Sequence, residues 1–231
     1  MDGFDKLVEY IPLMLEGAVV TVTVAFVSLA IAVVLGLIAA SMKLSKSRLS
    51  NGIATTYTTV IRGVPDLVLM LLIFFGGQIQ VNNIGAYFEW DYIDVDAFTA
   101  GTLTIGFIFG AYMAETFRGA FLAVPVGLLE AGYAYGMSGW QVFARILMPQ
   151  MMRHALPGIG NNWLVLMKTT ALVSIIGLHD LVLNAGQAGG STRLPFIFYL
   201  FVAFAFLVFT TVSIWGLRWA EKRYSVGVRR V

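Results

Sequence analysis

Five long stretches of the chain contain almost no charged side chain, and this pattern restricts the fold more than any other feature. Lys168 is the single charge within them, and they span residues 17–42, 67–88, 97–114, 155–178 and 194–217. An α-helix of about 20 apolar residues crosses the hydrocarbon core of a bilayer. Charged residues make up only 12% of the 231 residues, whereas a soluble domain carries about 25%. The sequence therefore predicts an all-α membrane protein with five transmembrane helices in one domain, residues 1–231.

The basic residues predict the orientation, because short cytoplasmic loops hold the excess of Lys and Arg. With the N-terminus outside and the C-terminus in the cytoplasm, only Lys6 and Arg193 lie outside, and Arg62 and Lys168 fall within spans. The other basic residues then lie on the inner side: Lys43, Lys46, Arg48, Arg118, Arg145, Arg153, Arg218, Lys222, Arg223, Arg229 and Arg230.

Acidic residues are more frequent on the outer side, where Asp180 is one of them. They could help to collect a cationic partner. The simpler interpretation, which we favour, is that exposed turns are acidic for solubility.

The second apolar segment is longer than one span requires. Residues 51–78 contain Gly63 and Pro65. Proline removes a backbone donor and clashes with the preceding turn. We therefore expect a kinked or broken second helix.

The inner segment between the third and fourth spans is too long to be a turn. Gly136 is placed to end one short helix, and Ser138 with Gln141 has the spacing of a capping box that begins another. Small residues occur at 131, 132, 134 and 136, which would let the surface of a partner approach the backbone. The sequence predicts a helical elbow within residues 119–152 that docks on another protein.

The elbow resembles a known family. Glu130-Ala131, then Gly136, then Ile146-Leu-Met-Pro149 is similar to the loop motif of permease subunits of ABC importers. The resemblance implies that Glu130, Ala131, Gly132, Gly136, Ile146 and Pro149 form a coupling helix region that contacts the ATP-binding subunit. The chain departs from the usual pattern at Gly132, where Ala is common, and at Met148, where Leu is common.

Other segments extend the resemblance over almost the whole chain. Arg62-Gly-Val-Pro65, Ala111-Tyr112, Arg118-Gly119, Pro157 with Asn161, and the ending Arg-Tyr-Ser-Val-Gly-Val-Arg resemble permeases of polar amino acid importers, most closely those for histidine and lysine/arginine/ornithine. The resemblance implies a location in the lipid of the bacterial inner membrane. It also implies that this chain and a second homologous permease subunit together form a path for basic amino acids. The other implied partners are two copies of an ATP-binding subunit, which carry ATP and Mg²⁺, and a periplasmic substrate-binding protein.

The chain itself is not expected to be an enzyme. It contains no Gly-x-x-x-x-Gly-Lys-Ser/Thr phosphate loop, so ATP must be bound by another chain. The elbow could be mistaken for a DNA-binding helix-turn-helix, but its flanking spans and scarcity of Lys and Arg argue against nucleic acid. Glu130 could serve the dipole of its own helix; pairing with a basic residue of the ATP-binding subunit is the favoured interpretation.

Four ionisable residues lie within or beside the spans, where a charge costs about 2.5 to 3.5 kcal/mol at mid-depth. Arg62, Asp66, Glu115 and Lys168 are therefore candidates for the substrate path. For Glu115 a structural pair with Arg118 is favoured. Lys168 should face a polar cavity or an acid. Asp66 either lines a cavity for a cationic side chain or pairs with Arg62 at i,i+4, and both interpretations stay open.

Two other function classes are less consistent with the sequence. An ion-coupled transporter could use Asp66, Glu115 and Lys168 as a relay, but five spans cannot form two equal inverted halves. A membrane hydrolase would need a Ser-His-Asp or His-Glu-x-x-His arrangement. His154 and His179 are isolated from each other, and without cysteine we expect no metal site.

Overall fold

The computed structural model describes residues 3–224, and these residues form helices and connecting segments but no strand. Five helices are long and apolar enough to cross a membrane, as the sequence predicted: Asp5–Leu44, Asp66–Tyr87, Ala97–Leu122, Gly139–Ile176 and Pro195–Tyr224. The elements in order are α1 (Gly3–Leu44), α2 (Arg48–Gly63), α3 (Asp66–Tyr87), α4 (Ala97–Leu122), α5 (Val126–Ala134), α6 (Gly139–Val142), the π-helical turn η1 (Phe143–Leu147), α7 (Met148–Thr169), the 3₁₀ turn η2 (Thr170–Ile176), α8 (Leu181–Thr192) and α9 (Pro195–Tyr224).

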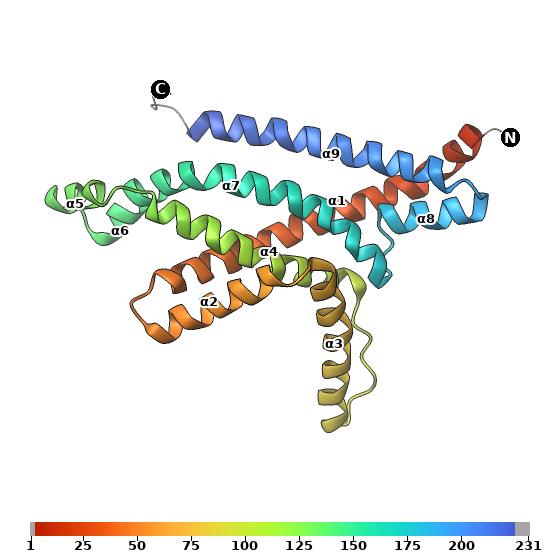
Figure 1. The fold of residues 1–231 in the computed structure, drawn as a ribbon, viewed down its shortest axis with the longest axis horizontal. Helices are drawn as coiled ribbons and strands as arrows, with labels where there is room; N and C mark the ends of the chain where they lie inside the picture. Colours follow the sequence, from red (N-terminus) through yellow and green to blue (C-terminus); the bar gives the residue numbers. More distant parts are fainter. Residues whose placement is uncertain (1–2, 225–231) are drawn as a thin grey trace.

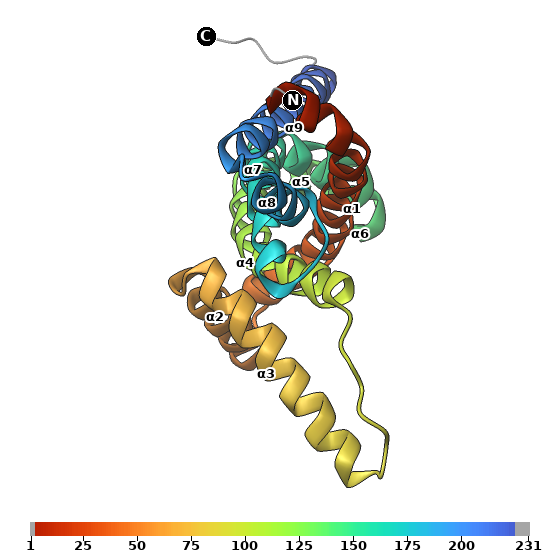
Figure 2. The same ribbon diagram turned by 90° about the vertical axis from the view of Figure 1, so that its right-hand side faces the viewer.

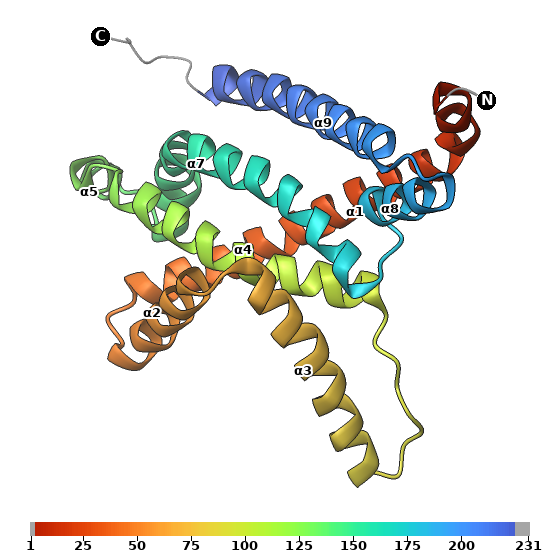
Figure 3. The same cartoon turned by 45° about the vertical axis from the view of Figure 1, so that its right-hand side comes forward.

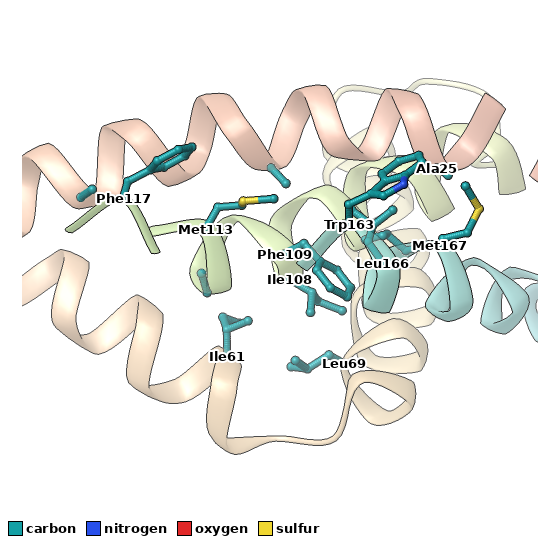
Figure 4. Close-up of a cluster of buried hydrophobic side chains, with 14 of the residues drawn as sticks. Ala25, Ile61, Leu69, Ile108, Phe109, Met113, Phe117, Trp163, Leu166 and Met167 are labelled. Carbon is teal, nitrogen blue, oxygen red and sulfur yellow. The ribbon is translucent and has the colours of Figure 1, made fainter. Parts of the chain in front are cut away.

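Four helices form a bundle along the long axis of the molecule, namely α1, α4, α7 and α9 (Figure 1). The central helix is α4, because 67% of its most apolar segment is buried, against 11% in α3 and in α9. Figure 4 shows the core around it, where Phe109 and Met113 of α4 lie near Trp163 of α7. The core is continuous, so α4 supplies the rigid frame on which the other elements are placed.

Small residues allow α1 and α4 to pack closely. A Cβ added at Gly106 of α4 would lie 2.5 Å from the Ile31 side chain, and one added at Gly36 of α1 would lie 2.5 Å from Met113 Cβ. Without an apolar–polar contrast inside a bilayer, close van der Waals packing is what holds such helices together. These two glycines therefore fix the α1–α4 crossing.

The break that the sequence predicted near Pro65 separates α2 from α3. Val64 is extended, with φ −108° and ψ 139°, and Pro65 caps the new helix without a side-chain hydrogen bond. From this point α3 projects away from the bundle in all three views (Figures 1, 2 and 3). Asn82 ties the return segment to α3, because its carboxamide exchanges two 2.8 Å hydrogen bonds with the Ile93 backbone.

The short helix α8 was not foreseen in the sequence. It lies beside α1 and α9 (Figure 1), and its N-terminus approaches Gly17 so closely that a Cβ there would lie 2.8 Å from the Asp180 carbonyl oxygen. Asn184 donates a 2.9 Å hydrogen bond from Nδ2 to the Leu13 carbonyl, and the Leu181 amide donates to Thr21 Oγ1 at 3.2 Å. Polar contacts thus join α8 to α1.

Asp180 caps α8, and the interpretation of it as an exposed acidic turn was wrong. Its side chain is fully buried, and Oδ1 accepts a 2.8 Å hydrogen bond from the Leu183 amide. Within the described residues, Asp180 Oδ2 and Asn184 Oδ1 have no hydrogen-bond partner. Burial raises the pKa of the Asp180 carboxyl to about 6.

Candidate functional site: the elbow and a charged pocket

The elbow has the two-helix form that the sequence predicted. The chain leaves α5 through Gly136 in the left-handed conformation, with φ +78°, which glycine adopts without the Cβ penalty. Ser138 then begins α6 with a complete capping box: its amide donates to Gln141 Oε1 at 2.9 Å, and the Gln141 amide donates to Ser138 Oγ at 3.4 Å. Local signals alone therefore determine the elbow.

Gly132 closes the elbow instead of presenting a docking surface. It is buried, and a Cβ at this position would lie 2.6 Å from Ile146 Cδ1 and 3.1 Å from Val142 Cγ2. The small-residue face that we expected at 131, 132, 134 and 136 is therefore divided, because Gly132 and Ile146 contact each other within the elbow. Pro149 is the second residue of α7 and directly follows the π-helical turn η1, and the helix continues through it from Gly139 to Ile176.

The outer surface of the elbow is well suited to contact another protein. Glu130 and Ala131 are exposed. The side chain of Tyr135 is 88% exposed and that of Trp140 is 73% exposed, although large aromatic residues are usually covered in a stable assembly. Glu130 is the fifth residue of α5, beyond the first turn in which the helix dipole acts. The dipole interpretation of Glu130 therefore has no support.

Lys43, Glu115 and Arg118 form an ionic cluster across α1 and α4. The Lys43 ammonium pairs with Glu115 Oε1 and donates to Thr58 Oγ1 of α2 at 2.8 Å, and Arg118 Nε donates to Glu115 Oε2 at 2.9 Å. The predicted Glu115–Arg118 pair is thus present. The participation of Lys43, 72 residues from Glu115, was not foreseen, because we had assigned Lys43 only to the inner turn.

A polar pocket of about 430 Å³ lies beside this cluster, between α1, α2 and α4. Arg62 contributes its guanidinium, whose carbon lies 5.5 Å from the centroid of the Tyr112 ring. The pocket is lined by Lys43, Thr58, Thr59, Arg62, Gly63, Tyr112 and Glu115. Two of the four candidate residues, Arg62 and Glu115, are therefore brought together.

Asp66 and Lys168 lie outside the lining of this pocket. Asp66 is the first residue of α3 and is partly buried. No ion pair joins it to Arg62 within residues 3–224, so the internal i,i+4 pair was wrong. Lys168 is exposed in the last turn of α7 and has no acidic partner among the described residues. The expected acid beside Lys168 is therefore not found in this part of the chain.

Five helices that are long and apolar enough to cross a membrane, with an elbow of two short helices between the third and the fourth, fit a transmembrane permease subunit. Residues 32–226 match the family described as the binding-protein-dependent transport system inner membrane component. The chain belongs to this family. Such a permease works with a partner permease, an ATP-binding subunit that hydrolyses ATP, and a substrate-binding protein, in agreement with the lack of a phosphate loop in the sequence.

Individual relatives are similar over nearly their whole length. The chain is 55% identical to the histidine/lysine/arginine/ornithine transport system permease protein HisQ of Escherichia coli (strain K12), over 94% of this chain and 95% of that protein. It is 42% identical to the octopine transport system permease protein OccQ of Rhizobium meliloti, over 94% and 92%. A crystal structure of an amino acid ABC transporter with histidines has a TM-score of 0.82 and 32% identity, covering 96% of this chain and 99% of that one.

Proposed function

We propose that this chain is a transmembrane subunit of an ATP-driven importer of basic amino acids in the bacterial inner membrane. The identity to a histidine/lysine/arginine/ornithine permease supports the substrate class. The second permease subunit is homologous to this one, two copies of the ATP-binding subunit hold ATP and Mg²⁺, and a periplasmic protein delivers the amino acid. The distribution of basic residues supports a periplasmic N-terminus and a cytoplasmic C-terminus, although Arg229 and Arg230 of the tail lie outside the described residues.

The exposed surface of the elbow is the observation that carries this proposal. Tyr135 and Trp140 present aromatic area at the end of the molecule where the elbow lies (Figure 1). Glu130 is free of any ion pair with a described residue, so it can bind a basic residue of the ATP-binding subunit. Closure of the two ATP-binding subunits would push this elbow, and α7, which follows it directly, would transmit the movement to the spans.

We assign the cationic side chain of the substrate to Asp66. It lies at the α2–α3 break, where a carboxylate faces no cation of its own chain within the described residues. An intramembrane charge without a partner is a functional candidate by default. We propose that Lys168, also unpaired, lies on the same path, and that Glu115 supports the path through its ionic cluster.

The test is transport by the complete assembly in proteoliposomes. Wild-type complex should accumulate labelled arginine, lysine and histidine only with ATP and the binding protein. Asp66→Asn should reduce uptake of all three at least about tenfold, because a charge-assisted contact is worth about 1.5 to 3 kcal/mol, while substrate-independent ATP hydrolysis stays unchanged. Uptake without the ATP-binding subunit would overturn the importer assignment, and unaltered uptake by Asp66→Asn would overturn the role of Asp66 alone.

A further inference from the structure

Arg62 is a cation in the membrane without an ionic partner in the described chain. Along α2 it lies about 21 Å from Arg48 at the inner end of the helix, at 1.5 Å per residue. The hydrocarbon core is about 30 Å thick, so the position that the basic residues predict for Arg48, at the inner boundary, would place Arg62 within the core; its side chain is exposed on the single chain. A guanidinium at this depth requires an anion or strong dipoles nearby.

The pocket wall offers Arg62 an aromatic ring and hydroxyls but no free carboxylate. Glu115 is the single acid in the lining, and both of its oxygens are occupied by Lys43 and Arg118. The charge that remains uncompensated in the pocket is therefore positive. The Tyr112 ring stacks near the guanidinium at 5.5 Å and limits the directions in which it can turn.

We propose that this pocket binds the α-carboxylate of the transported amino acid, with Arg62 as the anion-binding residue and Tyr112 as its positioning residue. A planar guanidinium matches a carboxylate in bidentate geometry. This inference rests on the proposed function and deepens it, because it assigns a pole of the substrate that Asp66 does not bind.

The position of Asp66 gives the pocket an orientation. Arg62 is in the last turn of α2 and Asp66 is the first residue of α3. Four residues of chain span at most about 14 Å, so the two opposite charges lie within the reach of one extended amino acid and its own side chains. A basic amino acid carries a carboxylate beside its α-ammonium group at one end and a cationic side chain at the other. Arg62 then selects the carboxylate and Asp66 selects the cationic side chain.

The experiment separates the two poles with three labelled ligands. Arginine has both charges, agmatine is arginine without the carboxylate, and citrulline keeps the carboxylate but has a neutral side chain. Binding is measured on the complete transporter in nanodiscs without the binding protein, so that the selectivity of the membrane subunits is observed directly. Wild type should bind arginine more tightly than either of the other two.

Arg62→Gln should weaken arginine and citrulline binding about 10- to 100-fold, as for the loss of a charge-assisted contact, and leave agmatine binding unchanged. Asp66→Asn should weaken arginine and agmatine and leave citrulline unchanged. Tyr112→Leu should weaken arginine binding less than Arg62→Gln does. When Arg62→Gln is already present, adding Tyr112→Leu should cause no further loss of arginine affinity. The matched control is Arg48→Gln, which removes an exposed cation from the opposite end of α2.

Several outcomes would contradict the proposal. Equal losses for arginine and agmatine in Arg62→Gln would show that the residue acts on folding and not on the carboxylate. Equal affinity of the wild-type complex for arginine and agmatine would also contradict the proposal, because the carboxylate would then contribute nothing to binding. If inorganic phosphate or vesicles rich in phosphatidylglycerol raise the melting temperature of wild type but not of Arg62→Gln, with no ligand discrimination, the pocket holds a phosphate group instead. Failure of wild type to bind any of the three ligands would count against the proposed function itself.

Discussion

The elbow and the polar groups between the spans are built in opposite ways. In the elbow, Ser138 and Gln141, three residues apart, exchange two hydrogen bonds. Gly136 adopts its positive φ angle because it has no Cβ, and this requires no contact with another residue. Between the spans, Lys43 depends on Glu115, 72 residues away, and Asn184 of α8 depends on the Leu13 carbonyl of α1. The turn of the elbow is therefore held by local hydrogen bonds, whereas Lys43 and Asn184 need partners that are distant in the sequence.

Glu115→Gln should give the largest effect, because it removes the acid shared by two cations. Breaking a buried pair by deleting one partner costs about 3 kcal/mol or more, and the Lys43 and Glu115 side chains are only 12% and 20% exposed. The free energy of unfolding in detergent micelles, followed by thermal or denaturant unfolding, measures the loss. Arg118→Gln is the matched control and should cost under about 1 kcal/mol, since Arg118 is 38% exposed and the Lys43 pair survives. If Glu115→Gln and Arg118→Gln lowered the free energy of unfolding equally, the long-range Lys43–Glu115 pair would be no more important than the local Glu115–Arg118 pair.

Asp180→Asn should have the next largest effect, in the opposite direction. Asparagine caps a helix as well as aspartate does, and the substitution removes a buried charge and replaces Oδ2, a buried oxygen without a hydrogen-bond partner among the described residues. The rise of the Asp180 pKa from 3.8 to about 6 corresponds to a gain of at most about 3 kcal/mol at pH 7.5.

The pH dependence of this gain follows from the raised pKa of Asp180. Between about pH 4 and pH 6 the folded state binds more protons than the unfolded chain, so wild-type stability falls as the pH rises through this window. The advantage of Asp180→Asn in stability should therefore be largest at pH 7.5, fall to about a third of that value by pH 4.5 and vanish only below about pH 3.5. An advantage that is independent of pH would assign the effect to hydrogen bonding alone.

Gly132 tests whether the elbow is as self-contained as its contacts indicate. Gly132→Ala should be tolerated with little loss, because the Cβ meets the mobile end of the Ile146 side chain at 2.6 Å. Gly132→Leu should overpack the elbow at a cost of about 1 to 2 kcal/mol, seen as earlier proteolysis of residues 126–147 while the melting of the bundle is unchanged. Loss of bundle stability in this variant would show that the elbow is part of the bundle after all.

The same contrast explains what the sequence could predict. The elbow, the break at Pro65 and the five spans were predicted correctly, because caps, proline and apolar runs are local signals. The small face at Gly132 was misassigned, since its partner Ile146 lies across the elbow turn. The roles of Lys43 and Tyr112 depend on helices distant in the sequence, and Asp180 is buried because α1 packs against it at Gly17. The helix α8 was missed because 12 residues rich in Gly and Ala resemble a loop more than a span.

Glu130→Gln should give the smallest change in the isolated chain and a specific change in the assembly. The side chain is exposed and has no ion pair with a described residue, so the free energy of unfolding should stay within about 0.5 kcal/mol of wild type. If Glu130 binds a basic residue of the ATP-binding subunit, the substitution should weaken that contact and lower transport per ATP hydrolysed several-fold, more at low salt than at high salt. Glu9→Gln, an exposed acid near the other end of the molecule, is the control for net charge. If both variants reduce transport equally, the loss reflects overall charge, and the elbow would then contact its partner through Tyr135 and Trp140 instead of Glu130.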